Sequence, residues 1–180
     1  MRNISPDSVA TTFPHPLLTP IVGRPTYQTL ASLHLKLNAN AASVFSNRGD
    51  GMHGLLELSV SPETYLSTTG MAFVPPVNPG LHPTNIGAND TNVQIAHATR
   101  EHDAFRKEWQ EWIATDIALK NQLVNAIDDL YLQSLRSRVT GYTSLTTQTM
   151  PITLVSAVGK RIARTPVAVL PMDRTFDSWK

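Results

Sequence analysis

The segment from residue 92 to 138 constrains this chain most, because it contains no proline or glycine and its apolar residues recur every three or four positions. Such spacing places side chains on one face of an α-helix. The series is Phe105, Trp109, Trp112, Ile113, Ile117, Leu123, Val124, Ile127, Leu130, Tyr131 and Leu135. One helix of this length would span about 70 Å, which is long for a single domain. We therefore expect a break near Ala114-Thr115-Asp116, with helices at about 92–113 and 116–138.

A second helical pattern covers residues 26–45, and Pro25 or Thr26 suits its first position. Its expected inner face comprises Tyr27, Leu30, Leu33 or His34, Leu37, Ala41 and Val44. The core should form where this helix meets the long segment. We expect the buried residues there to be Phe105, Trp109, Ile113 and Ile117 against Leu30, Leu33 and Leu37.

The remaining segments are less regular. Five prolines in residues 1–25 predict an extended arm, whose apolar cluster at Phe13, Leu17, Leu18, Ile21 and Val22 can lie in a groove of the body. Residues 55–60 suit either a short strand or a helical turn. A short helix is expected from residue 62 to about 69, capped by Ser59 or Ser61. Residues 70–90 hold four prolines and three glycines and predict a loop, and Gly141 suits a helix C-cap.

These patterns predict an all-α fold, a small irregular bundle of three to five helices. The expected organisation is an extended arm at 1–25, a helical domain at 26–140 with its loop at 70–90, and a divergent, poorly ordered basic tail at 141–180.

The charge of the chain is unevenly distributed. Residues 1–150 contain ten Lys and Arg against twelve Asp and Glu, whereas residues 151–180 contain five against two. A body of about −2 does not predict tight nucleic-acid binding, but the basic end allows weak, salt-sensitive contacts with phosphates. The candidate nucleic-acid-binding residues are Arg136, Arg138, Lys160, Arg161 and Arg164.

The sequence offers little catalytic chemistry. It has no cysteine, which excludes disulfides and thiolate metal sites. His97 and His102 are five residues apart and do not share a helix face as a zinc pair would, although Glu101 and Asp103 lie beside them. The serines and threonines lack an activating neighbour. We expect no enzyme activity, no bound cofactor or metal, and no small-molecule substrate.

One motif needs separate treatment. Gly49-x-Gly51-x-x-Gly54 matches a dinucleotide-binding string, but that motif requires a buried strand before it and a helix after it. A predicted helix precedes it here, so a flexible turn is the better interpretation. The overlapping tripeptide Arg48-Gly49-Asp50 spells an adhesion signal by chance. No run of eighteen apolar residues and no signal-peptide pattern is present, so we expect a cytoplasmic, non-membrane protein.

Several short blocks carry a family resemblance. They lie at residues 13–23, 26–27, 33–43, 49–51, 54–56, 73–80, 112–120 and 142–147. Through these blocks, residues 5–147 resemble the N-terminal region of Gag-like polyproteins of copia-type LTR retrotransposons. The proline-rich block at 13–23 and the run Leu33-His34-Leu35-Lys36-Leu37-Asn38-Ala39-Asn40 are its most specific parts.

The resemblance implies a capsid-like helical domain that associates with itself around RNA and has no catalysis of its own. Beyond residue 150 the chain departs from the family pattern and becomes basic, so we expect a truncated or frame-shifted copy. The expected partners are other copies of the chain and, weakly, RNA. The alternative from another class is a helical adaptor or weak nucleic-acid-binding module that uses the basic C-terminal region.

Overall fold

The computed structural model describes residues 4–84, 86–87, 89–133, 136–138 and 141. Within these ranges it contains five α-helices and one short 3-10 helix, and no strand beyond an isolated bridge between Ser137 and Gly141. The elements are α1 (Pro6–Ala10), α2 (Tyr27–Ser43), η1 (Leu56–Leu58), α3 (Pro62–Thr69), α4 (Asn92–Ala126) and α5 (Asp129–Leu132). The predicted all-α class is confirmed. The prediction of a poorly ordered tail falls on residues outside this description.

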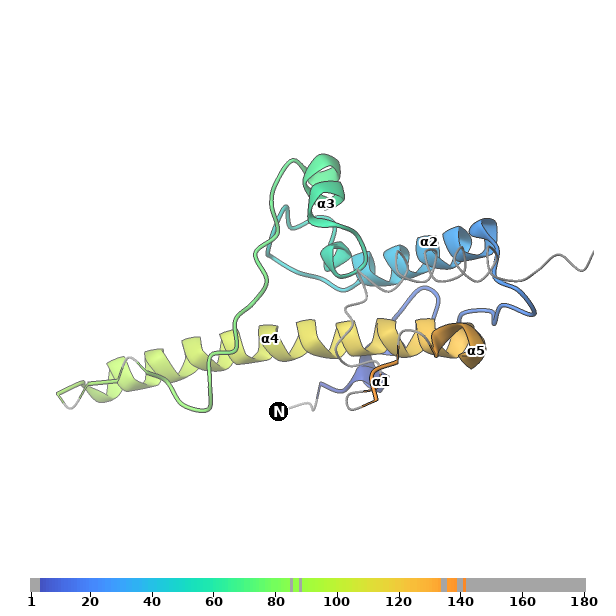
Figure 1. Cartoon of the computed structure of the whole chain (residues 1–180). Helices are drawn as coiled ribbons and strands as arrows, with labels where there is room; N and C mark the ends of the chain where they lie inside the picture. The colour runs from blue at the N-terminus through green and yellow to red at the C-terminus, as the bar shows by residue number, and fades with distance from the viewer. Residues whose placement is uncertain (1–3, 85, 88, 134–135, 139–140, 142–180) are drawn as a thin grey trace, which may run out of the picture.

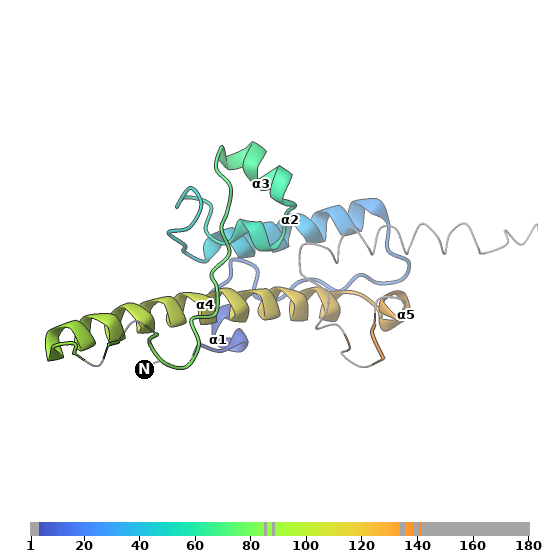
Figure 2. The same cartoon turned by 60° about the vertical axis from the view of Figure 1, so that its left-hand side comes forward.

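α4 is one continuous helix of 35 residues, so the predicted break near Thr115 is wrong. The Thr115 hydroxyl donates to the Glu111 carbonyl at 2.7 Å, and Asp116 pairs with Lys120 at 2.7 Å. Both side chains are therefore satisfied within the helix and do not compete with its backbone bonds. Figures 1 and 2 show the N-terminal half of α4 projecting well beyond the body that α2 and α3 form.

The helix also ends earlier than predicted. It stops at Ala126, and Ile127 is extended with φ −125° and ψ 134°. The side chain of Asp128 then accepts from the N–H of Leu130 and starts α5. A helix running to residue 138 is therefore wrong, and Gly141 belongs to the bridge with Ser137 rather than to a helix C-cap.

The buried face of α4 is not the predicted one. Phe105 is 49% exposed and Ile117 is 37% exposed, whereas Trp109 and Ile113 are half-buried. The buried residues of the helix are His102, Ala114, Thr115, Ala118, Leu119, Gln122, Leu123 and Ala126. Small residues form much of this face because the arm and α2 approach α4 closely, and a search for large apolar side chains overlooks them.

α2 begins and faces inward largely as predicted. Thr26 caps it through reciprocal bonds with Thr29, and the predicted inner-face residues Leu30, Leu33, Leu37 and Ala41 are buried. Tyr27 is the exception, since it is exposed at the first position of the helix.

The two short elements that follow resolve earlier alternatives. Residues 56–58 form the 3-10 helix η1 rather than a strand. Ser61 caps α3, and Gly70 ends it in the left-handed conformation at φ 73°. The predicted loop then leads to α4.

The N-terminal arm belongs to the core. Phe13 and Leu18 are buried with residues of α2 and α4, although Leu17 and Val22 of the same predicted cluster are exposed. Figures 1 and 2 show the arm running between α2 and α4. It is not extended throughout, since Ser5 caps the short helix α1 in a capping box with Ser8.

No helix in the described ranges combines the length and apolar composition that crossing a membrane requires.

Candidate functional site

The predicted basic set is described only in part. Arg136 and Arg138 are exposed on either side of Ser137, which exchanges two backbone hydrogen bonds with Gly141. Lys160, Arg161 and Arg164 lie outside the described residues. The structure therefore presents two of the five predicted phosphate-binding side chains to solvent and does not test the other three.

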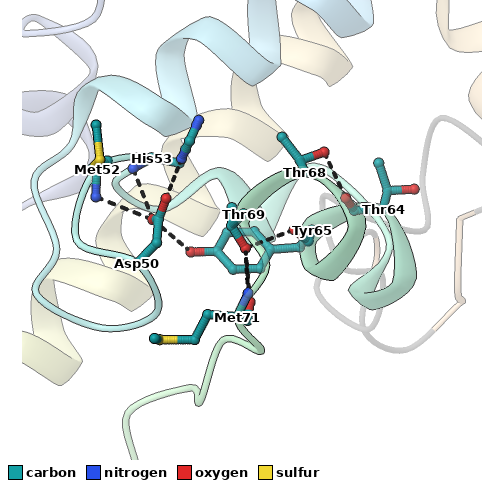
Figure 3. A network of polar contacts seen from close by, with 8 residues as sticks. All are labelled: Asp50, Met52, His53, Thr64, Tyr65, Thr68, Thr69 and Met71. Carbon is teal, nitrogen blue, oxygen red and sulfur yellow. Dashed lines mark hydrogen bonds and ion pairs between the residues drawn. The ribbon is translucent and has the colours of Figure 1, made fainter.

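The densest cluster of titratable side chains surrounds Asp50 (Figure 3). Its Oδ1 accepts the backbone N–H groups of Met52 and His53 at 3.2 and 3.1 Å, and the hydroxyl of Tyr65 at 3.4 Å. Its Oδ2 is paired with Nδ1 of His53. The hydrogen bond from His53 is the main reason that the pKa of Asp50 is lowered to about 2. The carboxylate thus ties residues 50–53 to α3.

Tyr65 is the centre of the α3 side of this cluster. Its side chain is almost fully buried and packs edge-on against Phe73, with ring centroids 5.6 Å apart. Burial raises the pKa of its phenol, because the phenolate would lose hydration. Below it, the Thr69 hydroxyl donates to the Tyr65 and Met71 carbonyls and accepts the Met71 N–H, which holds the end of α3 (Figure 3).

The glycine motif serves this packing. Gly49, Gly51 and Gly54 all have positive φ, at 66°, 69° and 50°. A Cβ on Gly49 would lie 2.2 Å from the Tyr65 hydroxyl, and one on Gly54 would lie 2.3 Å from the Val44 carbonyl. The turn predicted at this motif is confirmed, and its glycines are needed for turn geometry and close packing rather than for a pyrophosphate.

Arg48 fastens the same turn to α4. Its guanidinium donates to both carboxylate oxygens of Glu108, at 2.8 and 2.9 Å, and to the Val74 carbonyl at 3.1 Å. Because Arg48 and Asp50 are both bonded within the fold, the Arg48-Gly49-Asp50 tripeptide is not presented as a free signal. Bidentate pairing of this kind is geometrically specific, and here it joins three segments distant in sequence.

Chemically, the Asp50 and His53 pair resembles the orienting half of a catalytic dyad, in which a carboxylate holds one imidazole nitrogen and directs the other elsewhere. In the described part of the chain, the His53 ring is bonded to Asp50 and to no hydroxyl nucleophile. None of the described cavities is lined by His53. The geometry supports a structural clamp.

Sequence reasoning missed a second polar cluster, which we call the arm clasp and define as Asn40 of α2 and Gln122 of α4. Asn40 is fully buried; its amide accepts the His15 N–H at 2.8 Å and donates to the His15 carbonyl at 2.8 Å. Gln122 donates to the carbonyls of His15 and Pro16 at 2.9 and 2.8 Å, and its oxygen accepts from Asn40 at 2.8 Å. The two amides are 82 positions apart, so no local spacing signals the clasp.

The two tryptophans of α4 differ in their surroundings. Trp112 packs against the core, and its indole N–H donates to Glu57 of η1 at 3.4 Å. Burial raises the pKa of Glu57 most, the Trp112 bond lowers it, and nearby Asp116 raises it further. Trp109 is half-buried and stands outside the core cluster, which makes it less of a core residue than predicted.

The predicted absence of a paired histidine site concerns His97 and His102. His97 is exposed, with Nδ1 4.0 Å from Glu101, whereas His102 is buried and its Nε2 has no hydrogen-bond partner among the described residues. Within the described ranges no three His, Cys, Asp or Glu side chains gather as metal ligands would.

The described surface also carries a shallow apolar groove of about 350 Å³ between the end of α2 and α4. Its largest apolar walls are Phe45, Leu55, Pro76, Phe105 and Trp112. The open shape and the lack of convergent polar groups do not suit a small-molecule site.

Comparisons with known proteins add no assignment: no family model, no curated protein and no solved structure matches this chain.

Proposed function

We propose that this chain is a non-enzymatic structural protein of the Gag-like type, which associates with further copies of itself. The blocks at residues 13–23 and 33–43 resemble that family, and their places in the fold agree with a structural role. The first block fills the groove between α2 and α4, and the second forms the inner helix that holds it.

The observation that carries the proposal is a run of exposed apolar side chains beside the projecting half of α4. Soluble proteins that act alone rarely display large contiguous apolar surface, and such surface commonly marks contact with another protein. The exposed residues of this run are Met71, Val74, Val77, Leu81, Ile86 and Val93. Together with the open groove at Phe45, they give a surface suited to contact with protein rather than with a small molecule.

Sedimentation velocity over a wide range of protein concentration tests the proposal. We expect the weight-average mass to rise with concentration, and Val77→Asp combined with Leu81→Asp to suppress that rise. Leu35→Asp is the matched control, because Leu35 is equally exposed but lies on α2, away from the run. A chain that stays monomeric at every concentration would refute self-association.

The alternative function, weak binding to nucleic acid, is favoured by one observation: Arg136 and Arg138 are both exposed. If they contact phosphates, affinity for single-stranded RNA should fall with salt, with each contact adding about 0.7 to the logarithmic slope. Replacing both by Glu should flatten the slope. Arg100→Glu on the projecting part of α4 is the control, and an unchanged slope in the double variant would exclude these two side chains.

A further inference from the structure

We propose that residues 4–22 of one copy can occupy, in a second copy, the groove between α2 and α4 that they fill in their own chain. Two copies would then be joined by exchanged arms. This inference rests on the proposed function, since it names one contact through which the chain associates with itself.

The groove recognises the arm in a way that does not depend on covalent connection. The arm clasp bonds to main-chain groups of His15 and Pro16, and Ala126 accepts the N–H of Ile21 at 2.8 Å. Phe13 and Leu18 are the buried anchors on either side of the clasp. Main-chain bonds flanked by apolar anchors are the usual means by which proteins bind extended peptides. An identical arm from another copy meets the same groups.

The connector between arm and body is suited to opening. Val22 is 96% exposed and Arg24 is exposed, so neither is held by packing. Gly23 between them has φ 78° and free space around its Cβ position. This left-handed residue reverses the chain so that the arm can reach its own groove.

Prolines bound this connector on both sides, at Pro20 and Pro25. Their fixed φ values stiffen the short segment and favour an extended path. In an exchanged pair Gly23 no longer needs a positive φ, while every contact of the arm with the groove is retained. Exchange of an identical element of this kind is a low-cost route to a dimer, and short strained connectors promote it.

A reciprocal exchange closes on itself after two copies. Assembly beyond the pair then requires a second contact of a different kind, because a two-fold contact cannot propagate. The exposed apolar run from Met71 to Val93 lies apart from the arm groove in the sequence and is free to supply it.

The first test changes the connector. Gly23→Ala keeps the composition of the arm and the groove but disfavours the left-handed turn, so it destabilises the closed monomer and leaves the exchanged pair unaffected. Two connectors open in each pair, and the dimer dissociation constant should fall on the order of tenfold or more. Gly80→Ala is the matched control, since Gly80 has φ 83°, free space around its Cβ position and a place in the exposed loop.

The second test reports the exchange directly and uses the absence of cysteine from the chain. Thr19 and Ser32 line one cavity, from the arm and from α2 respectively. One full-length chain carries Thr19→Cys and another carries Ser32→Cys; the two are mixed, equilibrated and treated with a short bis-maleimide. We expect a covalent heterodimer. In the control mixture Ser67→Cys replaces Ser32→Cys, which moves the thiol to the exposed face of α3.

The outcomes separate this inference from the proposed function. Concentration-dependent association that is equal in wild type, Gly23→Ala and Gly80→Ala, without the Thr19 to Ser32 product, overturns arm exchange and leaves self-association standing. A wild-type chain that is monomeric throughout refutes the proposed function. The exchange inference stands in that case if Gly23→Ala dimerises and yields the crosslinked product, and falls if it does not.

Discussion

Asp50 and Glu57 show how the same type of side chain acquires opposite properties from its surroundings. The Asp50 carboxylate accepts hydrogen bonds from His53, Met52 and Tyr65, which favour its charged form. Glu57 is desolvated against Trp112 and lies near a second acid, Asp116, which favour its neutral form. These two residues are only seven positions apart, so their electrostatic roles follow from the packing of η1 and α3.

Acid should weaken the fold through Asp50. Its pKa is about 2 in the folded chain against 3.8 for the unperturbed group, so the unfolded state takes up the proton first as pH falls. The stability that Asp50 provides is present above pH 4 and is lost between about pH 4 and 2. We expect Asp50→Asn to lower the thermal midpoint at pH 7 and to flatten the pH dependence in that window. Identical pH profiles of wild type and variant would contradict this.

Glu57 should behave in the opposite sense. Because burial raises its pKa in the folded state, its ionisation above that pKa opposes folding, and this penalty is absent where both states are protonated. Glu57→Gln retains an acceptor for the Trp112 N–H and should raise the thermal midpoint at pH 7, with a gain that shrinks as pH falls. The control is Glu63→Gln, since the pKa of Glu63 is lowered by bonds at the start of α3 and that variant should not stabilise.

At the scale of single elements, α4 contains two distinct halves within one unbroken helix. The C-terminal half buries a face of small and medium residues against the arm and α2. The N-terminal half projects and exposes most of its side chains (Figure 1). Trp109, Ile113 and Ile117 lie to one side of the buried face, which explains why the most conspicuous apolar series in the sequence is only half-buried.

This orientation predicts contrasting effects at neighbouring positions. Ala118 is 2% exposed, so Ala118→Leu should overpack the contact with the arm and α2 and destabilise the fold by about 1–3 kcal/mol. Ile117→Ala removes a side chain on the partly exposed side and should have a smaller effect, below about 1 kcal/mol. Urea denaturation of both variants measures the difference. The reverse order would mean that the large apolar series faces the core after all.

At the scale of the whole molecule, the arm clasp joins three segments that the sequence keeps far apart. Asn40, His15 and Gln122 form one buried hydrogen-bonded unit at the centre of the hydrophobic core. A buried polar group is costly when it lacks a partner, so this unit favours a single position of the arm along the groove. It therefore couples the arm to the cooperative unfolding of the body.

The clasp allows a matched comparison within one helix. Asn40→Ala leaves the His15 N–H and the Gln122 oxygen without their partner and should destabilise the fold by about 2 kcal/mol or more. Asn38→Ala removes a buried oxygen that has no hydrogen-bond partner and should change stability by less than about 0.5 kcal/mol, or increase it. Equal losses in the two variants would show that the clasp is not what positions the arm.

The sequence by itself determined the local features of this protein. Proline and hydroxyl side chains at Thr26 and Ser61 place the starts of α2 and α3, and apolar spacing identifies the buried side of α2. These depend on hydrogen bonds and contacts within a few residues, so a linear pattern reveals them.

Only the tertiary structure decided how these elements are used. The continuity of α4, its buried face, the arm clasp and the cluster of Asp50 with Tyr65 depend on partners between four and 107 positions away. Glycines at 49, 51 and 54 illustrate the difference, since the string is visible in the sequence while its purpose appears only when Tyr65 lies against Gly49. Side chains are assigned to core, surface or site by what packs against them, and no periodicity within one segment contains that information.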